Sequence, residues 1–211
     1  MGWLWAGLFL AVSAYCLTRV VAGLRNRVAP SCAGHAFGPD VDLAHIVMGV
    51  GMAAMFSPLG DHVPRLVWVV PFALTAGWFA VRMLRDWPRL RHAGSRERAW
   101  HWHHLVDPLA MVYMAAVMPT GSTAMAGMAD MAASSAAANP LTTTVDLGFL
   151  GYFALFVVWS AGAVVRVPAR AQLVPAGAGG ALGSVLLSPR AGVSCQTLIG
   201  IGMAYAFVVM L

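Results

Sequence analysis

The sequence contains no lysine, and charged side chains of any kind make up only 10% of its 211 residues. A soluble domain carries about 25% charged residues, so the composition argues against an ordinary water-exposed protein. No long polar stretch is present that could form a second, soluble domain. With 60% hydrophobic residues and a mean hydropathy of +0.74, residues 1–211 are predicted to form a single transmembrane domain.

Cysteine is also scarce. Cys16 and Cys195 fall within apolar segments and Cys32 in a predicted loop, a distribution that does not suggest a disulfide framework. The first apolar segment lacks the preceding basic region of a cleaved signal peptide, because its arginines follow it. We therefore expect an uncleaved first span with its amino end outside. The sequence also shows no nucleotide-binding loop, Ser-His-Asp constellation or nucleic-acid-binding module, and no enzymatic activity is indicated.

What the sequence does contain is six apolar segments. A bilayer core of roughly 30 Å requires about 20 residues of helix, and the segments predict an all-α, polytopic membrane helical bundle. The expected spans are roughly 3–23, 41–57, 66–84, 100–118, 147–165 and 193–211. The apolar part of the fourth begins only at Leu105, so its helix is expected to start earlier, in "RAWHWHH". Residues 119–146 are predicted to form an external loop and residues 166–190 a cytoplasmic one.

All 13 basic residues are arginines, and twelve of them lie on one predicted side of the membrane, at or after the ends of the first, third and fifth spans. Only Arg65 lies on the other side. By the positive-inside rule, the arginine-rich loops are cytoplasmic and both termini face outward, in a plasma membrane. The net charge of +5 is thus interpreted as a topology signal rather than a nucleic-acid surface. The predicted partner is the lipid bilayer, with a homo-oligomer or other membrane proteins left open.

Histidine and methionine recur along one face of two predicted spans. In "HIVMGVGMAAM", a helical step of about 100° places His45, Met48, Met52 and Met55 within an arc of roughly 80°. Asp42 lies one turn before this stripe. The fourth span carries a second stripe in the same order, histidine before methionine, made of His101, His104, Asp107, Met111, Met114 and Met118.

These stripes predict a copper site. Soft thioether and thiolate donors select Cu(I), whereas imidazole suits copper, zinc and iron. Thioether is neutral, so it can bind a monovalent cation without burying a charge of its own. We expect binding or passage of Cu(I) between the two stripes, with His45 and His104 near the inner surface and the methionines toward the outer one. Cys195 and Cys16 are additional sulfur candidates, and Met125, Met128 and Met131 continue the series in the external loop.

Asp107 is an acidic residue within a predicted span. Such a residue costs roughly 2.5–3.5 kcal/mol on insertion scales and usually faces the bundle interior with a partner. His45, His104 and Arg19 are the expected candidates for that partner. His103, on the other face of the same helix, is predicted to be an interfacial residue.

Two other interpretations stay open. Methionine fills irregular packing gaps, and the glycine- and alanine-rich spans allow helices to approach closely. The stripes would then be packing in a structural or scaffolding subunit that binds no ligand. Alternatively, His45 and His104 on two parallel spans could hold a haem as its axial ligands.

Four segments carry a family resemblance: "DLAHIVMGVGMAAMFSPLG", "WVVPFALTAGWFAVR", "HHLVDPLAMVYMAAVM" and "SCQTLIGIGMAYAFVVML". They resemble an uncharacterised family of actinobacterial membrane proteins, catalogued as a domain of unknown function with the serial number five-one-three-four. The resemblance implies a plasma-membrane helical bundle and transfers no activity, because the family has none established. The stripes are also similar in chemistry to membrane copper-resistance and copper-uptake proteins, which is an analogy of sites only.

Overall fold

The structure is a computed structural model that describes residues 2–26, 39–57, 63–117, 140–166 and 189–211. Within these ranges it is entirely helical, which confirms the all-α prediction. The helices are α1 (Gly2–Asn26), α2 (Pro39–Met55), α3 (Arg65–Leu90), α4 (Ser95–Val117), α6 (Pro140–Arg166) and α8 (Pro189–Met210).

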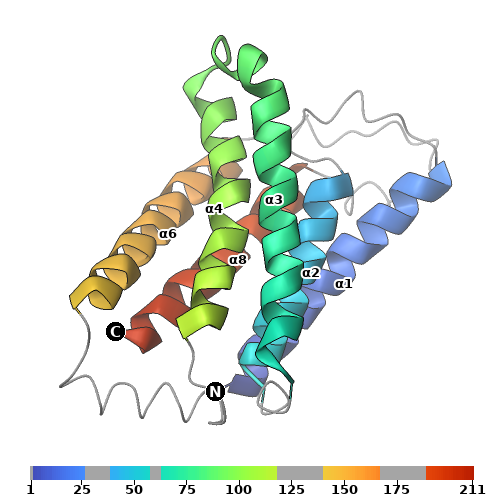
Figure 1. Ribbon diagram of the computed structural model, residues 1–211. Helices are drawn as coiled ribbons and strands as arrows, with labels where there is room; N and C mark the ends of the chain where they lie inside the picture. The colour runs from blue at the N-terminus through green and yellow to red at the C-terminus, as the bar shows by residue number, and fades with distance from the viewer. Residues whose placement is uncertain (1, 27–38, 58–62, 118–139, 167–188) are drawn as a thin grey trace.

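The helices associate chiefly as three pairs: α1 with α2, α3 with α4, and α6 with α8. Figure 1 shows α3 and α4 as a hairpin, with α1 and α2 on one side of it and α6 on the other. The start of α1 and the end of α8 both lie at the end of the bundle opposite the α3–α4 turn. The helices α2, α4 and α8 all run away from that turn, so equivalent positions in their sequences lie at similar depths (Figure 1).

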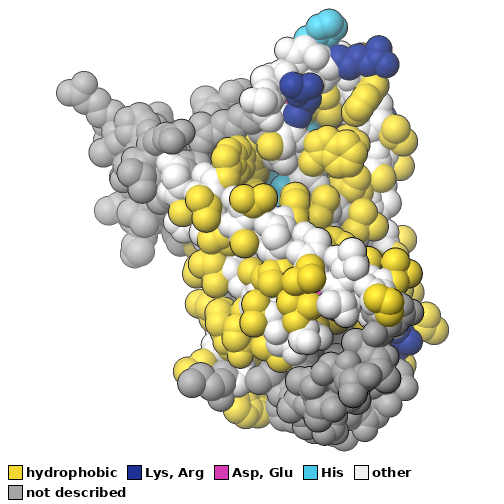
Figure 2. All heavy atoms as spheres, turned by 90° about the vertical axis from the view of Figure 1, so that its left-hand side faces the viewer, with side chains coloured by type: hydrophobic (Ala, Val, Ile, Leu, Met, Phe, Trp, Pro, Cys, Tyr) yellow, Lys and Arg dark blue, Asp and Glu magenta, His cyan; other side chains and the backbone are white. Residues whose placement is uncertain are grey.

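The outer surface of the bundle is apolar. Leu4, Leu74, Leu155 and Val158 are each more than two thirds exposed, and Figure 2 shows hydrophobic side chains over most of the described part of one face, with arginine at its upper end. Four helical segments in the described ranges are long and apolar enough to cross a membrane: Gly2–Ala22, Arg65–Leu90, Pro140–Gly162 and Ala191–Met210. The helix α2, with 17 residues, and the more polar α4 are not among them.

Small residues let the helices approach closely around the core. A Cβ atom added to Gly49 of α2 would collide with the Ser13 side chain of α1, and one added to Gly202 of α8 would collide with the Phe9 ring. The Ser13 hydroxyl donates a hydrogen bond to the Phe9 carbonyl at 3.0 Å and lies 3.4 Å from the Ile46 carbonyl across the helix interface. The glycines thus position α1 against both α2 and α8.

Two loop boundaries differ from the sequence prediction. The helix α6 begins at Pro140 and α8 begins at Pro189, so residues 140–146 and 189–190 are helical and their assignment to the external and cytoplasmic loops was wrong. Proline at the first helical position fits such a start, because its missing N–H has no partner there in any helix. The early start predicted for the fourth helix is confirmed, since α4 begins at Ser95. Residues 119–139 and 167–188 of the two predicted loops lie outside the described residues.

Candidate metal centre

The methionines of the two stripes lie in the interior of the bundle. Met48 and Met52 on α2 and Met111 and Met114 on α4 are no more than 1% exposed. All four belong to one buried cluster, together with Met203 from α8. Met55, at the end of α2, belongs to the same cluster. The sulfur-bearing sides of α2 and α4 therefore face the core rather than the outer surface of the bundle.

The two histidines of the stripes lie next to each other. The ring centroids of His45 and His104 are 5.9 Å apart, with the ring planes inclined at 62°. Both side chains are buried, and Nε2 of His45 has no hydrogen-bond partner in the part of the chain that the structure describes. Nε2 of His104 lies 3.4 Å from the Gln196 amide nitrogen of α8, and its ring stacks on Phe79. Since α2 and α4 run in the same direction, both histidines lie nearer to the α3–α4 turn than the methionines do (Figure 1).

Aromatic rings surround the same interior. Phe9, Phe72, Phe153 and Phe207 are almost completely buried in the methionine cluster. Thioether sulfur packs favourably against aromatic rings. The arrangement therefore supplies both a set of soft donors and an environment that suits methionine as a packing residue.

Asp107 is buried, as expected, but its partner is one that the sequence analysis did not propose. Oδ2 of Asp107 lies 3.3 Å from Nε2 of His103, one turn earlier on α4. Nδ1 of His103 is 3.2 Å from the Tyr152 hydroxyl of α6, and the His103 ring stacks on Phe156 at 3.4 Å. The interfacial assignment of His103 was wrong: its side chain is fully buried because α6 covers that face of α4.

Asp42 and Arg19, both buried, form an ion pair between α2 and α1. Nε of Arg19 lies 3.3 Å from Oδ2 of Asp42. Next to this pair, one ligand atom each from Cys16, Asp42 and His45 lie within 4.8 Å of one another. The sequence identifies all three residues as candidates but does not group them, because the cluster depends on which faces of α1 and α2 meet.

The remaining candidates lie at the margins of this centre. His101 on α4 and Cys195 on α8 are half-buried, and Cys195 packs against the methionine cluster. Met118 and the loop methionines Met125, Met128 and Met131 lie outside the described residues.

Comparison with known proteins gives one match. The family described as "Domain of unknown function (DUF5134)" matches residues 38–210, which include every helix except α1. This confirms the family that the sequence resembles. Neither a curated protein nor a solved structure matches the chain.

Proposed function

The chain belongs to the DUF5134 family, and we propose that it is an integral membrane protein that binds Cu(I) in the core of its helical bundle. The ligands are drawn from the buried set Met48, Met52, Met111, Met114, His45 and His104. One observation carries this proposal: the thioethers of two helices and two adjacent imidazoles all lie in the interior of the bundle.

The spacing of the sulfur atoms along each helix supports a shared ion. Residues three or four apart on a helix have Cβ atoms about 5–6 Å apart, and flexible methionine side chains from two such positions can reach one cation. Met48 and Met52 are four apart on α2, and Met111 and Met114 are three apart on α4. Because thioether carries no charge, a monovalent ion is the cation that such a site holds with the least buried charge.

The order of donors along the helices supports movement of the ion as well as binding. Imidazoles lie toward the α3–α4 turn and thioethers toward the opposite end (Figure 1). Successive weak, similar sites would let an ion pass stepwise along the bundle.

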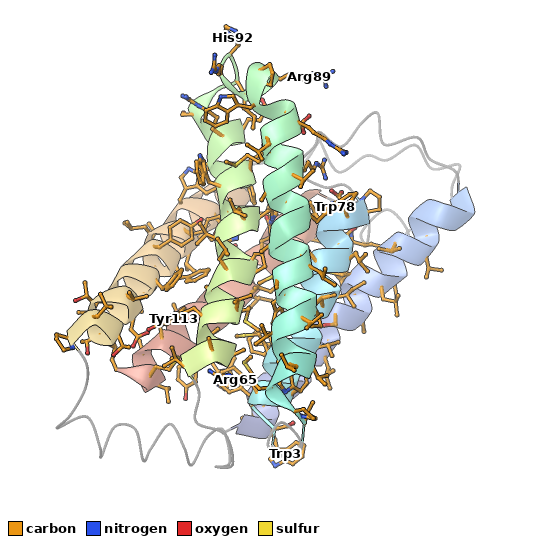
Figure 3. The ribbon with its side chains drawn as sticks, viewed as in Figure 1. Trp3, Arg65, Trp78, Arg89, His92 and Tyr113 are labelled. Carbon is orange, nitrogen blue, oxygen red and sulfur yellow. The ribbon has the colours of Figure 1, made fainter. Side chains whose placement is uncertain are left out.

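We further propose that all six helices cross a plasma membrane and that both termini lie outside. A length of 17 residues is at the lower limit for a membrane span. We therefore include α2 among the spans, because longer helices enclose it. Arg89 and His92 lie at the α3–α4 turn, whereas Trp3 and Arg65 lie at the other end (Figure 3). Arg65 has a local role there, because its Nε donates to the Ala115 carbonyl at 2.6 Å in the last turn of α4. The single exception to the arginine asymmetry is thus a helix-capping residue.

Metal analysis of the full chain, purified in detergent under reducing conditions with Cu(I), tests the copper proposal. We expect about one or more copper ions per chain. Replacing Met48, Met52, Met111 and Met114 together with leucine should abolish copper retention, because leucine keeps the volume and removes the donors. Met83→Leu is the matched control, since Met83 lies on α3 outside the buried cluster.

The result also separates the alternatives. If the fourfold leucine variant retains copper, the sulfur assignment is wrong. A Soret band in the purified protein would instead support haem between His45 and His104, for which their 5.9 Å separation is the favouring observation. Protein that is folded but binds neither copper nor haem would support the scaffolding interpretation, in which the methionines only pack against the phenylalanine rings.

A further inference from the structure

A second group of metal-ligating side chains lies beside the methionine core. Cys16 on α1 and Asp42 and His45 on α2 are all buried, and their ligand atoms lie within 4.8 Å of one another. Cys195, on α8, packs against the buried cluster that contains Cys16. Two helices therefore bring a thiol, an imidazole and a carboxylate to one place, and a third helix carries a second thiol against the same cluster.

One nitrogen of the imidazole in this group makes no hydrogen bond among the described residues. This nitrogen is Nε2 of His45, and it cannot turn to water instead because the residue is only 4% exposed. A buried polar nitrogen without a partner costs free energy, so the atom calls for an explanation. Asp42, by contrast, pairs with Arg19 through Oδ2, and its carboxylate has a second oxygen that can ligate a metal.

The donor set differs in chemistry from the methionine stripes. Thiolate, imidazole and carboxylate are the ordinary protein ligands of Zn²⁺, which thioether is not. Charge gives the same answer: two thiolates and one carboxylate carry three negative charges, and a divalent cation together with Arg19 carries three positive ones. A cluster whose charges balance can be buried, whereas a buried cluster with a net charge is strongly destabilising.

We infer that Cys16, Asp42, His45 and Cys195 form a tetrahedral Zn²⁺ site that joins α1, α2 and α8. Bonds to zinc of about 2.0–2.3 Å place neighbouring ligand atoms roughly 3.3–3.8 Å apart. The ligand atoms of Cys16, Asp42 and His45, within 4.8 Å of one another, are close to this spacing, and side-chain rotations, including one that brings in Cys195, would complete the site. Arg19 then holds the Asp42 carboxylate in position from outside the ligand set.

The site would attach α1 to the rest of the bundle. Residues 38–210 match the family, so α1 lies before the matched segment, and it contributes only Cys16 to the ligands. A zinc ion there would tie α1 to α2 and α8 through bonds stronger than helix packing alone. His45 is the one side chain shared with the copper proposal. A zinc-loaded chain would hold copper through His104 and the methionines.

Cobalt substitution tests this inference on the detergent-purified full chain. After treatment with a chelator, the protein is titrated with Co²⁺ and then with Zn²⁺. We expect one equivalent of Co²⁺ with the intense visible bands of a tetrahedral ion and a near-ultraviolet thiolate-to-cobalt band, both removed by Zn²⁺. The Cys16→Ser/Cys195→Ser variant should lose the thiolate band. Asp42→Asn and His45→Gln should each weaken Zn²⁺ binding by at least about tenfold while keeping the thiols.

Two controls make the result decisive. Asp86→Asn removes a half-buried carboxylate on α3 outside the cluster and should leave Co²⁺ binding unchanged. The fourfold methionine-to-leucine variant should also bind Co²⁺ normally, so this site and the copper site can fail separately. Weak octahedral Co²⁺ bands, or a thiolate band that persists without Cys16 and Cys195, would overturn the inference. If the double cysteine variant does not fold, unchanged Zn²⁺ affinity in Asp42→Asn and His45→Gln would overturn it as well.

Discussion

At the scale of single residues, the interior of this bundle is organised by buried polar side chains with few partners to choose from. His103 lies between Asp107 of its own helix and Tyr152 of α6, and Arg19 pairs with Asp42. Polar groups in a membrane domain face one another because lipid offers no alternative partner. The cost of an acidic residue within a span correctly placed Asp107 in the interior. It did not identify His103 as the partner. The four-residue spacing of His103 and Asp107 could have done so, because residues four apart are neighbours on any helix.

The His103–Asp107 pair should show energetic coupling. In a double-mutant cycle of His103→Phe and Asp107→Leu, each single change leaves one buried polar group without its neighbour, and the double change removes both. We expect the loss of unfolding free energy in the double variant to differ from the sum of the single losses by about 0.5–3 kcal/mol. Denaturation of the detergent-solubilised protein, followed by helical circular dichroism, measures it. Additivity within about 0.3–0.5 kcal/mol would mean that the two side chains do not interact.

At the scale of helices, most of the fold can be predicted from hydropathy and periodicity. Both patterns can be evaluated for one helix at a time, without knowing which helices pack together. The six segments and the inward faces of α2 and α4 were predictable for that reason. The cluster of Cys16, Asp42 and His45 was not, because it depends on the rotation of α1 against α2. That rotation is set by close contacts between helices, such as the one between Gly49 and Ser13. The residue pattern of one helix does not reveal such contacts.

The contact at Gly49 should therefore be sensitive to a single methyl group. Gly49→Ala places a Cβ atom against Ser13 and the Phe9 carbonyl, and overpacking of this kind typically costs about 1–3 kcal/mol. We expect a lower unfolding free energy in detergent for this variant. Gly7→Ala, on α1, is the matched control, because its added Cβ atom meets nothing within 4 Å. Equal stability of the two variants would show that α1 and α2 do not approach as closely as described.

At the scale of the whole molecule, an apolar exterior and an arginine-rich end define how the bundle would sit in a membrane. Leucine and valine cover the sides, and the α3–α4 turn, with Arg89 and His92, lies opposite the start of α1 and the end of α8 (Figure 3). From the arginine positions in the sequence, the positive-inside rule predicts that these two ends of the bundle lie on opposite sides of a membrane.

Reporter fusions test this orientation. Alkaline phosphatase fused after Leu211 should be active, because it folds only outside the cytoplasm, whereas green fluorescent protein at the same position should stay dark. A fusion within the α3–α4 turn, at Gly94, should give the reverse pattern. An inactive phosphatase after Leu211 would contradict outward termini, and equal results at the two positions would contradict an odd number of spans between them.

The proposal that the buried sulfurs of α2 and α4 bind Cu(I) is tested most directly by copper K-edge X-ray absorption on the reduced, copper-loaded full chain. The wild-type protein is compared with the variant in which Met48, Met52, Met111 and Met114 are leucine. We expect a Cu(I) edge with sulfur neighbours in the wild-type protein and loss of the bound copper in the variant. A copper ion surrounded only by nitrogen and oxygen, or a spectrum that the four substitutions leave unchanged, would contradict it.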